Sequence, residues 1–134
     1  MAWYVIACNQ NGQHVAAFGL EASSPKMFVS SDFGSTWTLT WTLTTNFVFR
    51  LAYDSTGQYM AASGYSNGVY TSSDYGRTWN MTSAPSKGSY AWISMSSDGK
   101  TIVTADAQDF SFLNFGGGGL WASSNRGSTW TEIA

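Results

Sequence analysis

Short apolar runs separated by polar turns follow one another along the whole chain. The runs are rich in β-branched, aromatic and small residues, and Gly, Asn, Asp and Ser stand between them. This pattern predicts strands and gives no convincing helix. We expect four strands in each of three successive units. The expected ranges are 3–8, 14–19, 27–30 and 36–40 in the first unit, 47–53, 58–63, 69–72 and 78–81 in the second, and 90–95, 101–105, 120–123 and 129–133 in the third.

The first strand of each unit lacks strict alternation of apolar and polar residues. Val5 to Cys8 and Val48 to Ala52 are almost continuously apolar. Such runs are typical of strands that are covered on both faces. A sheet packed between two neighbouring sheets provides that environment.

An octapeptide motif marks the repeat. The pattern Ser-Ser-Asp/Asn-x-Gly-x-Thr-Trp occurs at residues 30–37, 72–79 and 123–130, and turn glycines stand at Gly12, Gly57 and Gly99. Trp37 to Gly57 and Trp79 to Gly99 are both steps of 20 positions. Four-stranded units at a period of about 40 to 50 residues indicate propeller blades. The predicted fold is therefore all-β, a single repeat domain over residues 1–134 with three four-stranded antiparallel propeller blades at about residues 2–42, 43–84 and 85–134.

The residue types of the octapeptide predict a role in forming a turn. Its third residue can accept hydrogen bonds from backbone amides of the turn that it opens. Its glycine permits a positive φ, and the indole of its Trp can fold back over the turn. We therefore expect a structural role for Asp32, Gly34, Trp37, Asp74, Gly76, Trp79, Asn125, Gly127 and Trp130.

These motifs resemble the Asp-box, or bacterial neuraminidase repeat, family of β-propellers. The resemblance extends over essentially the whole chain, implies blade architecture and says almost nothing about function. The third box departs from the pattern because Asn125 replaces Asp; its side chain can still accept a hydrogen bond but carries no charge. A sialidase would need three clustered arginines and a Tyr/Glu nucleophile pair. The chain has only Arg50, Arg77 and Arg126, two of them inside boxes, so we expect no sialidase and no catalytic residues.

Charge and composition exclude several other classes. The net charge is −2, with only 10% charged residues, which gives no basic surface for nucleic acid. Cys8 and His14 are the single cysteine and histidine, so we expect no disulfide, no metal site and no cofactor. The sequence shows neither a signal peptide nor a membrane-spanning run, and we expect a soluble protein of undetermined compartment.

Positions that differ between the units are the candidates for binding. Phe28, Tyr70 and Trp121 occupy the same place in each third strand, where an aromatic ring can stack on a sugar or pack on the next blade. Arg50 is the one charge in an inner strand and is a candidate ligand residue. An insertion at about residues 106–118 carries Phe110, Phe112 and Phe115, either folded over its own blade or in contact with a partner or ligand.

Three blades are too few to close a propeller, which typically has four to eight. Uncovered blade faces of this size normally imply association. The sequence therefore predicts a homo-oligomer, either a homodimer of six blades or a homotrimer of nine.

The sequence leaves several functional hypotheses. The first is a lectin-like binding module with carbohydrate sites between blades. The alternative is a structural or engineered scaffold, or a fragment of a longer propeller, without a ligand of its own, and a glycosidase-like enzyme comes third.

Overall fold

In the described residues the apolar runs form twelve strands. The computed structural model describes residues 1–43, 48–64, 68–85, 89–107 and 118–134. The first sheet has β1 (Ala2–Cys8), β2 (Val15–Glu21), β3 (Ser24–Ser30) and β4 (Thr38–Thr42); the second has β5 (Val48–Tyr53), β6 (Met60–Gly64), β7 (Val69–Ser72) and β8 (Asn80–Met81); the third has β9 (Ser89–Met95), β10 (Ile102–Ala107), β11 (Leu120–Ser123) and β12 (Thr131–Glu132). Each sheet is antiparallel, with its strands in chain order. The prediction of three four-stranded antiparallel sheets is confirmed.

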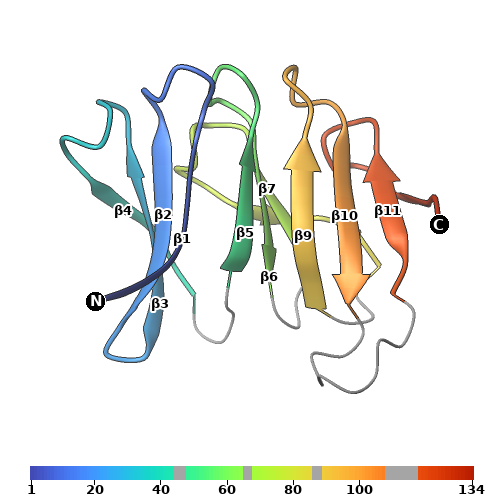
Figure 1. The fold of residues 1–134 in the computed structure, drawn as a ribbon, viewed down its shortest axis with the longest axis horizontal. Helices are drawn as coiled ribbons and strands as arrows, with labels where there is room; N and C mark the ends of the chain where they lie inside the picture. Colours follow the sequence, from blue (N-terminus) through green and yellow to red (C-terminus); the bar gives the residue numbers. More distant parts are fainter. Residues whose placement is uncertain (44–47, 65–67, 86–88, 108–117) are drawn as a thin grey trace.

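The three sheets, blades 1 to 3, stand side by side along the long axis (Figure 1), with the N-terminus at the blade 1 end and the C-terminus at the blade 3 end. Their first strands come together, because β1 contacts β5 and β5 contacts β9. The chain thus forms an arc of blades around its innermost strands.

The fourth strand of every blade begins two residues later than the sequence predicts. The turn of the octapeptide box is longer than expected because Asp32 Oδ1 accepts a hydrogen bond from the Thr36 amide at 2.8 Å. The indole Nε1 of Trp37 then donates to the Gly34 carbonyl at 3.0 Å. The same bonds recur in the boxes of blades 2 and 3. Thr and Trp of each box therefore belong to the turn, and pairing starts after them.

The hairpin between β2 and β3 is tighter than predicted. Ala22 and Ser23 alone connect the two strands, and both have positive φ, 49° and 67°. A two-residue turn of this hand suits the twist of antiparallel strands, although it usually contains Asn or Gly. Because the pair contains neither Asn nor Gly, no sequence signal for such a turn indicates that β2 and β3 extend to Glu21 and Ser24.

The hydrophobic core lies between blades. Phe18 and Met27 of blade 1 and Met60 of blade 2 are fully buried in one cluster, and Trp41 packs at its edge. A smaller cluster of Val69 and Ala84 joins blade 2 to residues of blade 3. Blade-to-blade contact is therefore the main source of apolar burial in this fold.

Candidate functional site: the open face of blade 1

Every blade has two faces, which the strand register defines. Residues that pair across neighbouring strands lie on the same face of a sheet. We call the front face the one that carries the cross-strand row Ile6, Ala17, Phe28 and Leu39 in blade 1, Leu51, Ala62, Tyr70 and Met81 in blade 2, and Ile93, Thr104, Trp121 and Glu132 in blade 3. The opposite, rear face carries Val5, Phe18 and Met27 in blade 1 and Trp92, Ala105 and Leu120 in blade 3.

In blades 2 and 3 the preceding blade covers the front face over the inner and middle strands, whereas Met81 on the outer strand β8 is 66% exposed. The Tyr70 ring meets the Trp41 ring of blade 1 edge-on, with centroids 4.8 Å apart. Trp79 of the second box stacks on the same Trp41 ring at 5.4 Å and 13°. In the third blade, Trp121 and Trp130 pack against the cluster of Val69 and Ala84. An aromatic in the third strand and the box Trp thus make the contact with the preceding blade.

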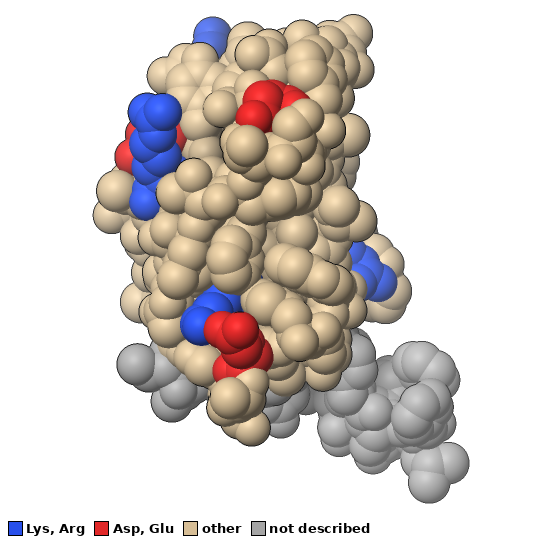
Figure 2. Space-filling view, turned by 90° about the vertical axis from the view of Figure 1, so that its left-hand side faces the viewer, with Lys and Arg blue, Asp and Glu red and all other residues tan. Residues whose placement is uncertain are grey.

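The front face of blade 1 has the same kinds of side chain and is exposed. Ile6 is 67% exposed and Trp3 58%. A groove of about 720 Å³ crosses this face and is lined by Met1, Trp3, Tyr4, Val5, Ile6, Ala17, Phe28 and Trp37. Figure 2 shows this end of the molecule, with a broad uncharged area and the few charged side chains in small groups around it. The face has the composition of an interior surface.

The rear face of blade 3 is the second open face. Trp92 is 59% exposed, Ile133 55% and Leu120 40%. The equivalent rear positions of blade 1, Phe18 and Met27, are fully buried against blade 2. The molecule therefore has one uncovered apolar face at each end of its long axis.

The tips of the blades repeat one contact at both internal junctions. His14 of blade 1 lies on the Tyr75 ring of the second box, with centroids 4.6 Å apart. At the next junction the Arg126 guanidinium of the third box lies 4.1 Å from the centroid of the Tyr59 ring. Tyr75 and Arg126 are the fourth residues of their boxes, where φ is positive in all three copies. The equivalent residue of blade 1, Phe33, is 68% exposed.

Close approach at the turn glycines shows the same contrast. A Cβ at Gly57 would lie 2.7 Å from His14 Cβ, and one at Gly99 would lie 2.9 Å from Tyr59 Cβ, both in the preceding blade. At Gly12 nothing lies within 4 Å. Blades 2 and 3 have a tightly fitted neighbour at this turn, and blade 1 has open space.

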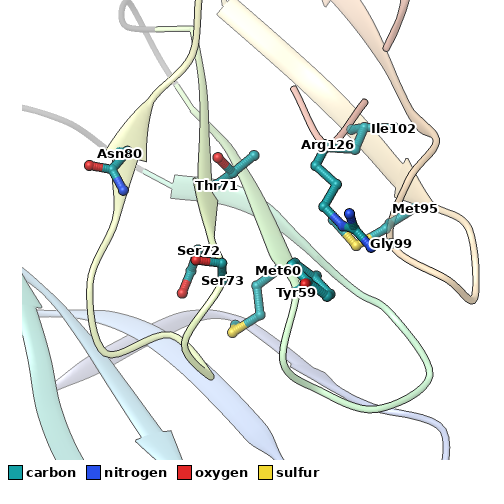
Figure 3. A pocket seen from close by; sticks show the side chains of 10 residues that line it. All are labelled: Tyr59, Met60, Thr71, Ser72, Ser73, Asn80, Met95, Gly99, Ile102 and Arg126. Atoms are coloured by element: carbon teal, nitrogen blue, oxygen red, sulfur yellow. The ribbon is translucent and has the colours of Figure 1, made fainter. Parts of the chain in front are cut away.

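Two pockets occupy equivalent places at the two internal junctions. The pocket between blades 1 and 2 holds about 210 Å³ and is lined by His14, Val29, Ser30, Ser31, Thr36, Thr38, Thr40, Tyr75 and Arg77. The pocket between blades 2 and 3 holds about 70 Å³, and Figure 3 shows Arg126 approaching it from blade 3 and Ser72, Ser73 and Asn80 lining it from blade 2. The Thr40 Oγ1 is buried without a hydrogen-bond partner among the described residues. Both pockets combine hydroxyl groups, an aromatic ring and an arginine.

The boxes set the local electrostatics. Hydrogen bonds from the Thr36 hydroxyl and amide and from the Ser30 hydroxyl lower the pKa of Asp32 from 3.8 to about 2. Burial acts to raise the pKa of Asp74, but hydrogen bonds from Thr78 and Ser72 lower it overall. Asn125 makes the equivalent bond to the Thr129 amide without a charge. The lowered pKa values favour the ionised form of Asp32 and Asp74, which accepts the hydrogen bonds of the turn.

The structure places the predicted ligand residues in different surroundings. Tyr70 and Trp121 lie at internal junctions, whereas Phe28 lies on the open face with its ring edge-on to Trp3 at 5.7 Å. Arg50 is exposed on β5 and pairs with Ser63 across the sheet. Phe110, Phe112 and Phe115 lie outside the described residues.

Three residues of these faces were not predicted from the sequence, namely Ile6 and Trp3 on the open face and Trp41 at the first junction. Trp41 has no aromatic counterpart in the other units, since Ser83 and Ala134 stand four positions after their box Trp. Ile6 has a signal in the sequence, because Leu51 and Ile93 match it in the repeat. Aligned apolar positions in the inner strand could therefore have identified the front face.

The described ranges contain no helix that could span a membrane. Nor do they hold a group of three or more His, Cys, Asp or Glu side chains arranged for a metal ion. Cys8 is exposed and unbridged.

Comparison with known proteins identifies the repeat. A family model for the BNR-Asp box repeat matches residues 27–40, which include β3 and the first box. No curated protein sequence shows a significant match. The chain thus carries the Asp-box repeat to which its motifs are similar.

Solved structures show the same fold. The GH74 xyloglucanase of Xanthomonas campestris is 14% identical with a TM-score of 0.71, and the match covers 96% of this chain and 22% of that one. YCF48 from Cyanidioschyzon merolae is 14% identical, with a TM-score of 0.71 and coverage of 98% and 37%. A putative TolB from Agrobacterium tumefaciens is 16% identical, with a TM-score of 0.69 and coverage of 96% and 45%. The chain is therefore a β-propeller module of Asp-box blades, and it spans less than half the length of each of these proteins.

Proposed function

We propose that this chain is a β-propeller binding module that completes its ring by joining copies of itself through the open faces of blades 1 and 3. The observation that carries the proposal is the contrast at one repeat position: the front face is covered in blades 2 and 3 and exposed in blade 1. A homodimer would have six blades, which lies within the usual range for closed propellers, and a homotrimer would have nine.

The physical support is the apolar character of both open faces. The exposed side chains of Trp3, Ile6 and Trp92 are large and apolar, and burying apolar surface stabilises association by about 25 cal/mol per Å² before the costs of association. Monomeric proteins rarely expose contiguous apolar patches of more than a few hundred Å². Because the front face of one copy meets the rear face of another, the contact is heterologous and closes only by rotation.

A charged residue on the open face tests the proposal. In Ile6→Asp a carboxylate would have to be buried at each new junction, so light scattering after size exclusion should give the mass of one chain, 14.5 kDa, where the unchanged chain gives a multiple of it. Met81→Asp is the matched control, because Met81 is 66% exposed on β8, away from both open faces. Equal masses for the unchanged chain and for Ile6→Asp would overturn the proposal.

Carbohydrate binding between the blades is a second proposed function. It is supported by the two equivalent pockets, in which Ser and Thr hydroxyls lie beside a ring of His14 and Tyr75 or of Tyr59. Such a pairing of polar groups with a ring suits a sugar, which has hydroxyl groups at its edge and CH groups on its face. A glycan array is the direct screen. Binding that is lost in Tyr75→Ala or Tyr59→Ala, each of which removes a ring that lines one pocket, would support a lectin-like module, and silence of the unchanged chain would leave a scaffold without its own ligand.

We do not extend catalysis to this chain from the xyloglucanase. Likeness at 14% identity concerns the fold alone. A glycoside hydrolase needs two carboxylates that flank one bond. Among the described carboxylates, Asp32, Asp54, Asp74 and Asp98 each accept hydrogen bonds within their own turns, and Glu21 pairs with Lys26. We therefore propose a module that is not an enzyme.

A further inference from the structure

The internal junctions specify how a second copy docks. Resting on the proposed self-association, we infer that blade 3 of one copy meets blade 1 of the partner subunit with the geometry of the two internal junctions, so that Thr101 lies against Phe33 of the partner subunit. The open face of blade 1 would thus bind blade 3 of a second copy, in the same register as the internal junctions. The contact between subunits would be a third instance of a contact that the chain already makes twice.

Two repeat positions carry the inference. The first comes just after the turn glycine and is His14 in blade 1, Tyr59 in blade 2 and Thr101 in blade 3. The second is the fourth box residue, Phe33, Tyr75 or Arg126. His14 contacts Tyr75, and Tyr59 contacts Arg126, so each blade uses its first position on the second position of the next blade. Thr101 and Phe33 are the members that remain.

Both remaining residues lie at the ends where the copies would meet. Phe33 is 68% exposed, and Thr101 is exposed. The Thr methyl group gives an apolar contact to a phenyl ring, so no buried charge is left without a partner. The turn glycine of blade 1, Gly12, has empty space where Gly57 and Gly99 meet the preceding blade. The tip of blade 1 is therefore shaped to receive the tip of blade 3.

The faces below the tips fit the same register. The front face of blade 1 is hollowed by its groove of about 720 Å³. The rear face of blade 3 carries the exposed side chains of Trp92, Leu120 and Ile133. At the first internal junction the rear positions Phe18 and Met27 fill the equivalent space and are fully buried. A groove at one end and projecting side chains at the other are complementary only in a head-to-tail arrangement.

Transplanting an internal contact onto the new junction tests the register. The variant with Thr101→Tyr and Phe33→Arg reproduces the Tyr59 and Arg126 pair between copies, provided that the two positions face each other. Measured by dilution and mass photometry, the double variant should associate about two- to fivefold more tightly per junction than the two single variants predict together. Phe33→Gln with Thr101→Tyr is the control, since it supplies a polar side chain without the cation.

The outcomes separate the register from the assembly itself. If the chain forms multimers but the double variant shows no coupling beyond the product of the single variants, the register is wrong and the proposed self-association stands. If the unchanged chain is a monomer, both proposals fail.

A cross-link provides an independent readout. In a Cys8→Ser background, chains with Thr101→Cys mixed with chains with Phe33→Cys should form disulfide-linked pairs, because bridged residues need Cα atoms within about 7 Å. Pairing of Met81→Cys with Phe33→Cys in place of Thr101→Cys would contradict the register.

Discussion

The front faces of blade 1 and blade 2 are built from the same repeat positions and end in opposite environments. Ile6 and Phe28 of blade 1 match Leu51 and Tyr70 of blade 2. Leu51 and Tyr70 pack against the core cluster that blades 1 and 2 share, whereas Ile6 is 67% exposed. The difference teaches that the same repeat positions are covered or exposed according to whether another blade precedes them in the chain.

The covered junction should be the most sensitive part of the molecule. Phe18→Ala removes a fully buried ring from the contact of blades 1 and 2 and should lower the free energy of unfolding by about 3 to 5 kcal/mol. Ile6→Ala, on the open face, should change the stability of the dissociated chain by no more than about 0.5 kcal/mol. Urea denaturation followed by Trp fluorescence measures both. Similar losses for the two variants would mean that the open and covered faces do not differ as described.

The box tryptophans give a matched pair with a smaller difference. Trp79 and Trp37 both donate a hydrogen bond to their box glycine carbonyl, but only Trp79 stacks on Trp41. Trp79→Ala should therefore cost about 0.5 to 1.5 kcal/mol more than Trp37→Ala. The comparison belongs in the Ile6→Asp background, where association does not contribute. A larger loss for Trp37→Ala would contradict the assignment of blade 1 as the blade without a preceding neighbour.

Acid should weaken the boxes of blades 1 and 2 and leave the third box unaffected. The pKa of Asp32 is lower in the folded chain, about 2, than its ordinary value of 3.8. The unfolded chain therefore takes up protons first, and the stabilisation present above pH 3.8 is lost as the pH falls toward 2. Asp32→Asn, which copies Asn125 of the third box, should reduce the loss of stability between about pH 5 and about pH 2. An unchanged pH profile would show that the carboxylate is not responsible.

The contact at the tip of the second junction should have the smallest effect. Arg126→Gln removes the cation above the Tyr59 ring and should lower stability by about 0.5 kcal/mol, the value for an exposed pair. Introducing Arg126→Gln into a Tyr59→Leu variant shows whether the loss of stability comes from the interaction between the two side chains. If Arg126→Gln has the same effect with and without the Tyr59 ring, the two side chains do not interact energetically.

Much of the fold could be predicted because its signals are local and repeated. The three boxes and the three turn glycines set the order of the strands, and the acceptor role of Asp32 follows from the chemistry of its side chain. The start of β4 could not be predicted, because Thr36 and Trp37 are strand-forming residues that are held in the turn by the bonds from the Thr36 amide to Asp32 and from the Trp37 indole to Gly34. At these two residues the hydrogen bonds of the box outweigh the local strand propensity.

The candidate site was harder to predict because it depends on which blades are neighbours. Phe28, Tyr70 and Trp121 were placed at one repeat position, but the contact of Tyr70 with Trp41 joins two blades and is not visible in a single unit. The meeting of His14 with Tyr75 likewise requires the curvature of the arc. Only the packed blades reveal that the equivalent positions at the two ends, Phe33 and Thr101, are exposed.

The most direct test of this account is the mass of the unchanged chain in solution across a dilution series through the micromolar range. Sedimentation velocity should show a closed species of two or three chains of 14.5 kDa each, which dissociates on dilution without an intermediate series of larger filaments. A single species of 14.5 kDa throughout the range would contradict the claim that the open blade faces bind one another.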